Sequence, residues 1–256
     1  MSILEIALVP CLKDNYAYLL RDPATGAVGV VDPSEAAPVE KALKARGWKL
    51  THILNTHHHL DHTGGNHALK AASGAVVVGP RPDKERIPDI DVALGEGESF
   101  KLGQAEARVL FIPGHTRGHI AFWFPESKAV FCGDTLFAIG CGRLFEGTPQ
   151  QMWSSLGKLK ALPEDTRVYC GHEYTQANAR FALTVEPENP ALKARAREVD
   201  RARAKGLPTI PSTIGEERAT NPFFRADEPA IAATIGLAGK DAVSVFAEVR
   251  KRKDHF

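Results

Sequence analysis

The chain has 256 residues, of which 43% are apolar, and a formal net charge of +1. This length and apolar content fit one large domain, or a main domain with a smaller appendage, and they exclude disordered and fibrous proteins. The near-neutral charge gives no general attraction to nucleic acid or to a membrane surface, so we expect neither partner. A small polar substrate and a monomeric protein are expected instead.

The cysteines of the chain are scattered and include no CxxC pair. They are Cys11, Cys132, Cys141 and Cys170. This spacing predicts reduced, mostly buried thiols and a cytoplasmic location. No apolar run approaches the roughly 20 residues of a membrane span, and the N-terminus has no basic region before a long apolar stretch. A secreted metal hydrolase is the alternative.

Short apolar runs alternate with turn residues over the first two-thirds of the chain. They predict strands at residues 4–9, 16–21, 27–31, 51–55, 75–78, 107–112, 119–124, 129–132 and 167–170. Helices are predicted at residues 35–46, 66–72 and 150–162, the first capped by Ser34 and ended by Gly47. Because strands outnumber helices and the helices occur singly, two packed sheets with helices outside are favoured over a doubly wound parallel sheet.

After Gly171 the sequence becomes rich in Ala, Arg, Lys and Glu. Its periodicity predicts helices at residues 173–184, 191–205 and 241–252. The Pro-rich, polar segment 208–225 is too long for a simple connector, so it is interpreted as a functional loop or a flexible segment. We therefore expect a main domain at residues 1–172 and a helical domain at residues 173–256.

Metal-ligand side chains are concentrated just after the 51–55 strand, at His57, His59, Asp61 and His62. Neutral imidazoles and a carboxylate are the ligands expected for zinc, with iron or manganese as alternatives. In an extended backbone His57 and His59 point the same way, whereas Asp61 and His62 face a neighbouring point. Two adjacent ions are therefore predicted. A His-rich surface loop or a cloning tag is the alternative, but this stretch is internal and mixed in composition.

Three further ligands follow one pattern, in which a strand is followed by a glycine and then by the ligand. They are His115, Asp134 and His172. The glycine lets the backbone turn sharply, and loops at one end of a sheet can bring distant positions together. The predicted ligand sets are His57, His59 and His115 for one ion and Asp61, His62 and His172 for the other, with Asp134 bridging them.

Two such ions would share a water whose acidity is raised enough to give a hydroxide nucleophile at physiological pH. Asp134 is therefore counted as catalytic. The other histidines are assigned to structural or solvent roles, namely His52, His58, His67, His119 and His255. Asp32 or His58 could support the ligands from behind.

The ligand pattern, His57-x-His59-x-Asp61-His62 with the later His115, Asp134 and His172, resembles the metallo-β-lactamase superfamily. More specific motifs resemble glyoxalase II, the hydroxyacylglutathione hydrolase family. These motifs are 10–16, 141–148, 171–175, 211–213 with 221–223, and 250–254. The resemblance extends from Val9 to Asp254. It implies an α/β (α+β) fold, an αββα sandwich with the metals at one edge, followed by a helical substrate-binding domain.

The resemblance also implies a set of residues at the substrate. They are Arg143, Phe145, Tyr174, Asn178, Arg250 and Lys253. The three cations would bind the glycine carboxylate of glutathione, and Tyr174 and Asn178 would hydrogen-bond its peptide. Two positions depart from the family, because Arg143 stands where many members have Lys and Phe145 replaces a frequent Tyr. A solvated helix end is the alternative for Arg250 and Lys253.

The implied reaction is hydrolysis of S-D-lactoylglutathione, or of another 2-hydroxyacylglutathione, to the 2-hydroxy acid and glutathione. This is the second step of methylglyoxal detoxification. A metal-bridging hydroxide would attack the acyl carbonyl, while the metals stabilise the oxyanion and the departing sulfur. A thiol leaving group, with a pKa of about 8.5, needs little help from a general acid. The sequence contains no GxSxG nucleophile motif.

Four alternatives to a two-metal thioester hydrolase are considered. One is another hydrolase of the superfamily, such as a lactamase, and a second is a mononuclear-iron persulfide dioxygenase, which the seven-ligand set argues against. A third is a nuclease, which the near-neutral charge disfavours. The last is a non-catalytic, metal-stabilised binding module, whose closed and usually Cys-rich sites differ from this His/Asp set.

Overall fold

The computed structural model describes residues 2–256. They form two compact units, one of residues 2–111 and 117–133 and the other of residues 112–116 and 134–256. The domain boundary expected between residues 172 and 173 stays a prediction. Within residues 2–256, no helix has the length and apolar character needed to cross a membrane.

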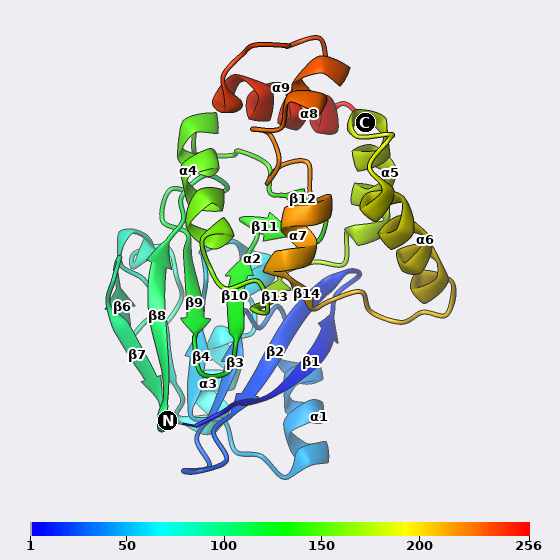
Figure 1. Ribbon diagram of the computed structural model, residues 1–256. Coiled ribbons are helices and arrows are strands. Elements are labelled where there is room, and N and C mark those ends of the chain that lie inside the picture. The colour runs from blue at the N-terminus through cyan, green and yellow to red at the C-terminus, as the bar shows by residue number, and fades with distance from the viewer. Residues whose placement is uncertain (1) are drawn as a thin grey trace. The chain divides into compact units, whose positions relative to one another are not determined.

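The first unit contains a six-stranded sheet in the order β1-β2-β3-β4-β5-β6 (Figure 1). Its strands are β1 (Glu5–Cys11), β2 (Asn15–Arg21), β3 (Val28–Val31), β4 (His52–Leu54), β5 (Val76–Pro80) and β6 (Val92–Leu94). The pairs from β1 to β3 are antiparallel, and those from β3 to β6 are parallel. Parallel neighbours need crossover connections. These connections carry the helices α1 (Ala36–Arg46), α2 (Leu60–Thr63) and α3 (Asn66–Ser73).

The helices α1 and α3 bury their apolar side chains against this sheet. Val39 of α1 and Leu69 of α3 belong to one buried cluster with Val30, Ile53 and Val77 of the central strands. These strands are nearly continuous runs of apolar residues, as is typical of parallel strands. The sheet and its helices therefore form a core that fixes the ends of β3 and β4.

The N-terminal cap expected for α1 is wrong. The N-cap residue is Glu35, whose backbone is extended and whose side chain makes no capping hydrogen bond. Its carboxylate instead accepts the backbone N–H of Leu12 at 2.8 Å. Ser34 lies one residue too early to cap the helix. The expected end at Gly47 is confirmed, since this residue has the left-handed φ of 64° that glycine adopts easily.

Four antiparallel strands form a second layer in the first unit. They are β7 (Ser99–Leu102), β8 (Ala105–Phe111), β9 (Ile120–Phe124) and β10 (Ala129–Gly133), each paired with the next. In β8 buried Ala107 and Val109 alternate with exposed Glu106 and Arg108, as expected for a strand with one buried face. The ring of Phe131 in β10 lies 5.6 Å from that of Tyr18 in β2, so the two layers pack face to face.

The second unit consists mostly of helices. Its elements are β11 (Leu136–Phe137), β12 (Gly140–Cys141), α4 (Pro149–Lys160), β13 (Arg167–Cys170), α5 (Thr175–Val185), α6 (Pro190–Ala204), β14 (Ser212–Thr213), α7 (Ile214–Thr220), α8 (Pro229–Thr234) and α9 (Ala242–Asp254). The helices α5 and α6 lie side by side (Figure 1) and share a core that includes Ala179 and Leu192. The expected α/β class, with sheets first and helices toward the C-terminus, is confirmed.

The interpretation of residues 208–225 as a functional loop or a flexible segment is wrong, because this segment contains β14 and α7. The Thr213 hydroxyl accepts the Glu216 N–H, and the Glu216 carboxylate accepts the Thr213 N–H, which makes a capping box at the start of α7. Buried Glu217 accepts a hydrogen bond from Arg195 of α6 at 2.6 Å. The short elements β6 and α8 were also not predicted.

We predict that Thr213→Ala lowers the free energy of unfolding by about 1 kcal/mol, because it leaves the Glu216 N–H at the start of α7 without its side-chain partner. Urea denaturation measures this change. Thr234→Ala is the matched control, since the Thr234 hydroxyl is exposed and only bonds back to the Ala230 carbonyl in its own helix. Equal losses in the two variants would contradict the capping role.

Candidate functional site

The carboxylate of Asp32 fixes the start of the histidine-rich loop. β3 and β4 are parallel, with Val31 opposite Leu54, so the residues that follow them emerge at the same edge of the sheet. Asp32 has a φ of 48°, a conformation that Asp tolerates better than most residues. Its Oδ1 accepts the Thr56 N–H at 2.8 Å, and its Oδ2 accepts the Thr56 hydroxyl at 2.6 Å. Both residues are buried.

The hydrogen bond from the Thr56 hydroxyl to Asp32 determines which nitrogen of His57 carries the proton. The Thr56 hydroxyl gives its one hydrogen to Asp32, so its oxygen accepts from His57 Nδ1, which lies 3.0 Å away. The lone pair of His57 is therefore on Nε2, which lies 3.2 Å from Nδ1 of His59. The structure thus brings together the two ring nitrogens that the sequence predicted to converge.

His62 is oriented by the same carboxylate. Its Nδ1 lies 3.1 Å from Asp32 Oδ2 and donates to it, which leaves the lone pair on Nε2. This Nε2 is 3.6 Å from Oδ2 of Asp61, and Asn15 donates to the same carboxylate oxygen at 3.1 Å. Ligand-type atoms of Asp32, His57 and His62 all lie within 4.8 Å of one another.

A ring-stacking contact also holds His57. The ring of His119 stacks on that of His57, with 4.5 Å between centroids, and Gly133 lies against both His119 and Thr56. A Cβ at Gly133 would be 2.2 Å from Thr56 Oγ1 and 2.9 Å from the His119 ring. The structural role expected for His119 agrees with this contact. Thr56 was missed, and the only signal for it was its position directly before the first predicted ligand.

The second unit has its own cluster of imidazoles and a carboxylate, all of them buried. Nε2 of His115 and Nε2 of His172 lie 3.5 Å and 3.3 Å from Oδ2 of Asp134. His115 Nδ1 donates to the carbonyl of Arg143 at 2.9 Å, so its lone pair is on Nε2. The ring of His172 is parallel to that of Tyr174, with 4.7 Å between centroids.

Each cluster has the donors that divalent metal ions prefer, imidazole nitrogens and carboxylate oxygens. His57, His59, Asp61 and His62 belong to the first unit, and His115, Asp134 and His172 to the second. The protons of His57, His62 and His115 are donated to oxygens of the chain, as is usual for metal-binding histidines. The clusters therefore support the binding of divalent metal ions.

The cations predicted to bind substrate lie near Asp254 at the end of α9. Nε of Arg143, whose side chain is 64% exposed, is 3.7 Å from the Asp254 carboxylate. Arg250 is buried, pairs with Asp254 at 3.1 Å and donates to the Cys141 carbonyl at 2.7 Å. The Lys253 ammonium lies over the ring of Phe181, 5.3 Å from its centroid. These residues form a cationic group that contains one carboxylate.

The other predicted substrate residues differ in their exposure. The ring of Phe145 is 62% exposed and lies 5.1 Å from the ring of His115. Tyr174 is 37% exposed. Asn178 is buried and donates to the Ala138 carbonyl at 3.1 Å. Phe145 and Tyr174 thus expose part of their rings beside His115 and His172, whereas Asn178 is buried.

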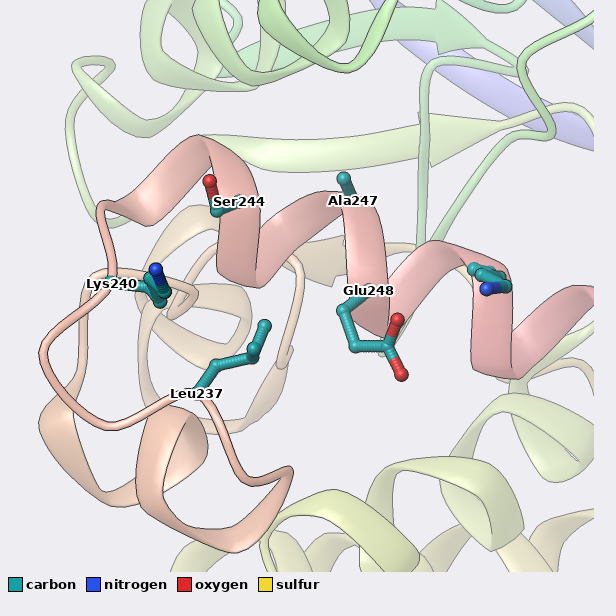
Figure 2. Close-up of a pocket in the computed structure, with 6 residues that line it drawn as sticks. Leu237, Lys240, Ser244, Ala247 and Glu248 are labelled. Carbon is teal, nitrogen blue, oxygen red and sulfur yellow. The ribbon is translucent and has the colours of Figure 1, made fainter.

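A separate pocket of about 440 Å³ lies between α9 and the segment before it (Figure 2). Its lining consists of Leu237, Lys240, Ser244, Ala247, Glu248 and Lys251. These residues differ from the six that the sequence predicted at the substrate, so this pocket is not the predicted substrate site.

Comparisons with known proteins cover nearly the whole chain. Residues 13–172 match the family described as "Metallo-beta-lactamase superfamily", and residues 173–256 match "Hydroxyacylglutathione hydrolase C-terminus". A hydroxyacylglutathione hydrolase from Methylococcus capsulatus is 60% identical over 254 residues, which are 99% of this chain and 99% of the relative.

Two solved structures are also similar. The structure of ETHE1 from Myxococcus xanthus is 26% identical, with a TM-score of 0.68 over 97% of this chain and 90% of that one. The structure of TTHA1623 in a di-iron-bound form is 27% identical, with a TM-score of 0.61 over 86% of this chain and 99% of that one. The expected fold family is therefore confirmed.

We predict a lowered pKa for the Lys253 ammonium, because its burial and the charges of Arg250 and Arg143 all disfavour the protonated form. The unfolded chain then binds this proton more strongly, so Lys253 makes the free energy of unfolding rise with pH between its folded and unfolded pKa values. NMR titration of the Lys253 side chain should give a higher pKa in Arg143→Ala than in the wild type. An unchanged pKa would contradict the assigned electrostatic cause.

Proposed function

The chain belongs to the hydroxyacylglutathione hydrolase (glyoxalase II) family of the metallo-β-lactamase superfamily, and we propose that it hydrolyses a 2-hydroxyacylglutathione thioester. S-D-lactoylglutathione would give D-lactate and glutathione, the second step of methylglyoxal detoxification. The observation that carries this proposal is the 60% identity to a relative of that name over 99% of both chains. We propose that residues 1–172 form the catalytic domain and residues 173–256 the substrate-binding domain.

We propose that two divalent ions bind, with zinc as the first choice and iron or manganese as alternatives. The proposed ligands are His57, His59, Asp61, His62, His115, Asp134 and His172. The fixed protonation of His57, His62 and His115 supports this assignment, since each presents Nε2 as its electron-pair donor. When bound, such ions polarise the acyl carbonyl and raise the acidity of a coordinated water.

The thiols of the chain are unsuited to act as nucleophiles. Burial raises the pKa of Cys141 to about 11 and that of Cys170 to about 12, so both remain protonated near neutral pH. All four cysteines are buried thiols. This state suits a reducing compartment, and we propose a monomeric, cytoplasmic enzyme that needs no covalent acyl intermediate on cysteine.

We propose that the substrate lies along the surface formed by Phe145 and Tyr174. The phenyl ring of Phe145 would keep water from the acyl group, and the stacked Tyr174 ring keeps the His172 imidazole in its orientation. Arg143 and Lys253 would bind the glycine carboxylate of glutathione by charge-assisted hydrogen bonds. Arg250 and Asn178, which we expected at the substrate, are buried and bonded to carbonyl groups, so we propose that they shape the wall behind it.

Asp134→Ala should lower the metal content below two ions per chain and abolish thioester hydrolysis, because it removes the carboxylate that both His115 and His172 face. Elemental analysis of the purified protein, with parallel rate measurements, tests this. Asp134→Asn is the control for shape, since it keeps the volume but not the charge. Two bound ions and a full rate in Asp134→Ala would contradict the proposed role.

Arg143→Ala should raise the KM for S-D-lactoylglutathione and leave kcat nearly unchanged, because the contact lies away from the reacting carbonyl. A charge-assisted contact of roughly 1.5 to 3 kcal/mol corresponds to about a tenfold to hundredfold rise. A small thioester without the tripeptide should be hydrolysed as by the wild type. Arg201→Ala, an exposed position on α6, is the control. Equal losses for both substrates would contradict carboxylate binding by Arg143.

A further inference from the structure

The ring of His58 is fixed at both of its nitrogens by side chains that the proposed mechanism does not use. His58 Nδ1 lies 3.2 Å from Oδ2 of Asp83, and Nη1 of Arg86 lies 3.1 Å from His58 Nε2. A guanidinium has donors and no acceptor, so Nε2 must accept from Arg86. The proton of the neutral ring is therefore on Nδ1, and it is donated to Asp83.

Asp83 and Arg86 are themselves fixed. Asp83 ends the short helix η1 (Arg81–Asp83), and its side chain is fully buried. Arg86 Nε donates to Asp83 Oδ1 at 3.1 Å, and Nη2 donates to the same oxygen. The carboxylate also lies directly on the backbone of Gly118, where a Cβ would be 2.2 Å from Asp83 Cγ. We call His58, Asp83 and Arg86 the His58 clamp.

The His58 clamp acts on a residue that lies between two proposed metal ligands. His58 lies between His57 and His59, and its ring centroid is 4.8 Å from that of His59. Since the ring of His58 cannot rotate without breaking bonds at both nitrogens, the backbone on either side of it is restricted as well. This restriction can reach His57 and His59 through the backbone that they share with His58.

We propose that Asp83 and Arg86 are positioning residues, which act through His58 to preorganise His57 and His59 for metal binding. This inference rests on the proposed function, because it assumes that these two histidines are ligands. Substitution of residues that support metal ligands typically changes metal affinity by about 10-fold to 100-fold. An ion pair made by a buried carboxylate, such as Asp83–Arg86, contributes little net stability compared with apolar residues, so specifying a conformation is the better explanation for it.

The test is the affinity of the full-length protein for zinc, measured by competition with a chromophoric chelator. We expect Asp83→Asn and Arg86→Gln each to weaken zinc binding by about 10-fold to 100-fold. Asp22→Asn is the matched control, because Asp22 is also fully buried in the first unit and accepts the Gln104 N–H at 2.8 Å. It should lower the thermal stability of the metal-free protein and leave zinc affinity within about twofold of the wild type.

A double-mutant cycle with His58→Ala separates positioning from general stability. If Asp83 acts through His58, Asp83→Asn should have no further effect on zinc affinity in the His58→Ala background. The same loss in both backgrounds, no loss in either, or an equal loss in Asp22→Asn would overturn the proposal. If Asp83→Asn does not fold, Arg86→Gln, whose side chain is 25% exposed, takes its place in the cycle. A wild-type protein that does not bind zinc, iron or manganese would instead overturn the proposed function.

Discussion

One buried carboxylate, that of Asp32, sets the chemistry of the histidine-rich loop. It accepts hydrogen bonds from the Thr56 N–H, the Thr56 hydroxyl and His62 Nδ1. A buried anion requires such donors, since an unpaired charge in the interior costs several kcal/mol. Because the hydroxyl hydrogen is committed to Asp32, His57 must also carry its proton on Nδ1. A single side chain thus directs the lone pairs of two imidazoles.

In the second unit a histidine proton is also fixed by an oxygen of the chain, but this oxygen belongs to the backbone. His115 gives its Nδ1 proton to the carbonyl of Arg143, so the backbone takes the part that Asp32 takes in the first unit. This bond also ties a proposed ligand to the residue whose side chain is proposed to bind glutathione. Tyr174 likewise contacts a proposed ligand, since its ring stacks on His172, and it is also partly exposed on the proposed substrate surface. In the proposed site, ligand orientation and substrate recognition would therefore use the same short segments.

Periodicity and motif spacing were sufficient to predict most strands, the main helices and the seven proposed ligands. They failed where tertiary contacts decide the outcome. The helix α7 was missed because its Pro-rich, polar surroundings obscured the Thr-x-x-Glu capping signal. It is also held by a tertiary contact, since Glu217 pairs with Arg195 on another helix. Arg250 is buried, and burial cannot be read from a basic motif at a helix end, whereas its expected place at the substrate stays a prediction. The pairing of Asp83 with His58 joins residues 25 positions apart, which no local pattern indicates.

The most direct test of metal-dependent thioester hydrolysis by this protein is the release of thiol from S-D-lactoylglutathione, followed before chelation, after chelation and after readdition of zinc, iron or manganese. Hydrolysis should be lost when the metal is removed and restored by a divalent ion, with the far-UV circular dichroism spectrum unchanged throughout. Hydrolysis that persists in the metal-free protein, or none with any of the three metals, would contradict this expectation.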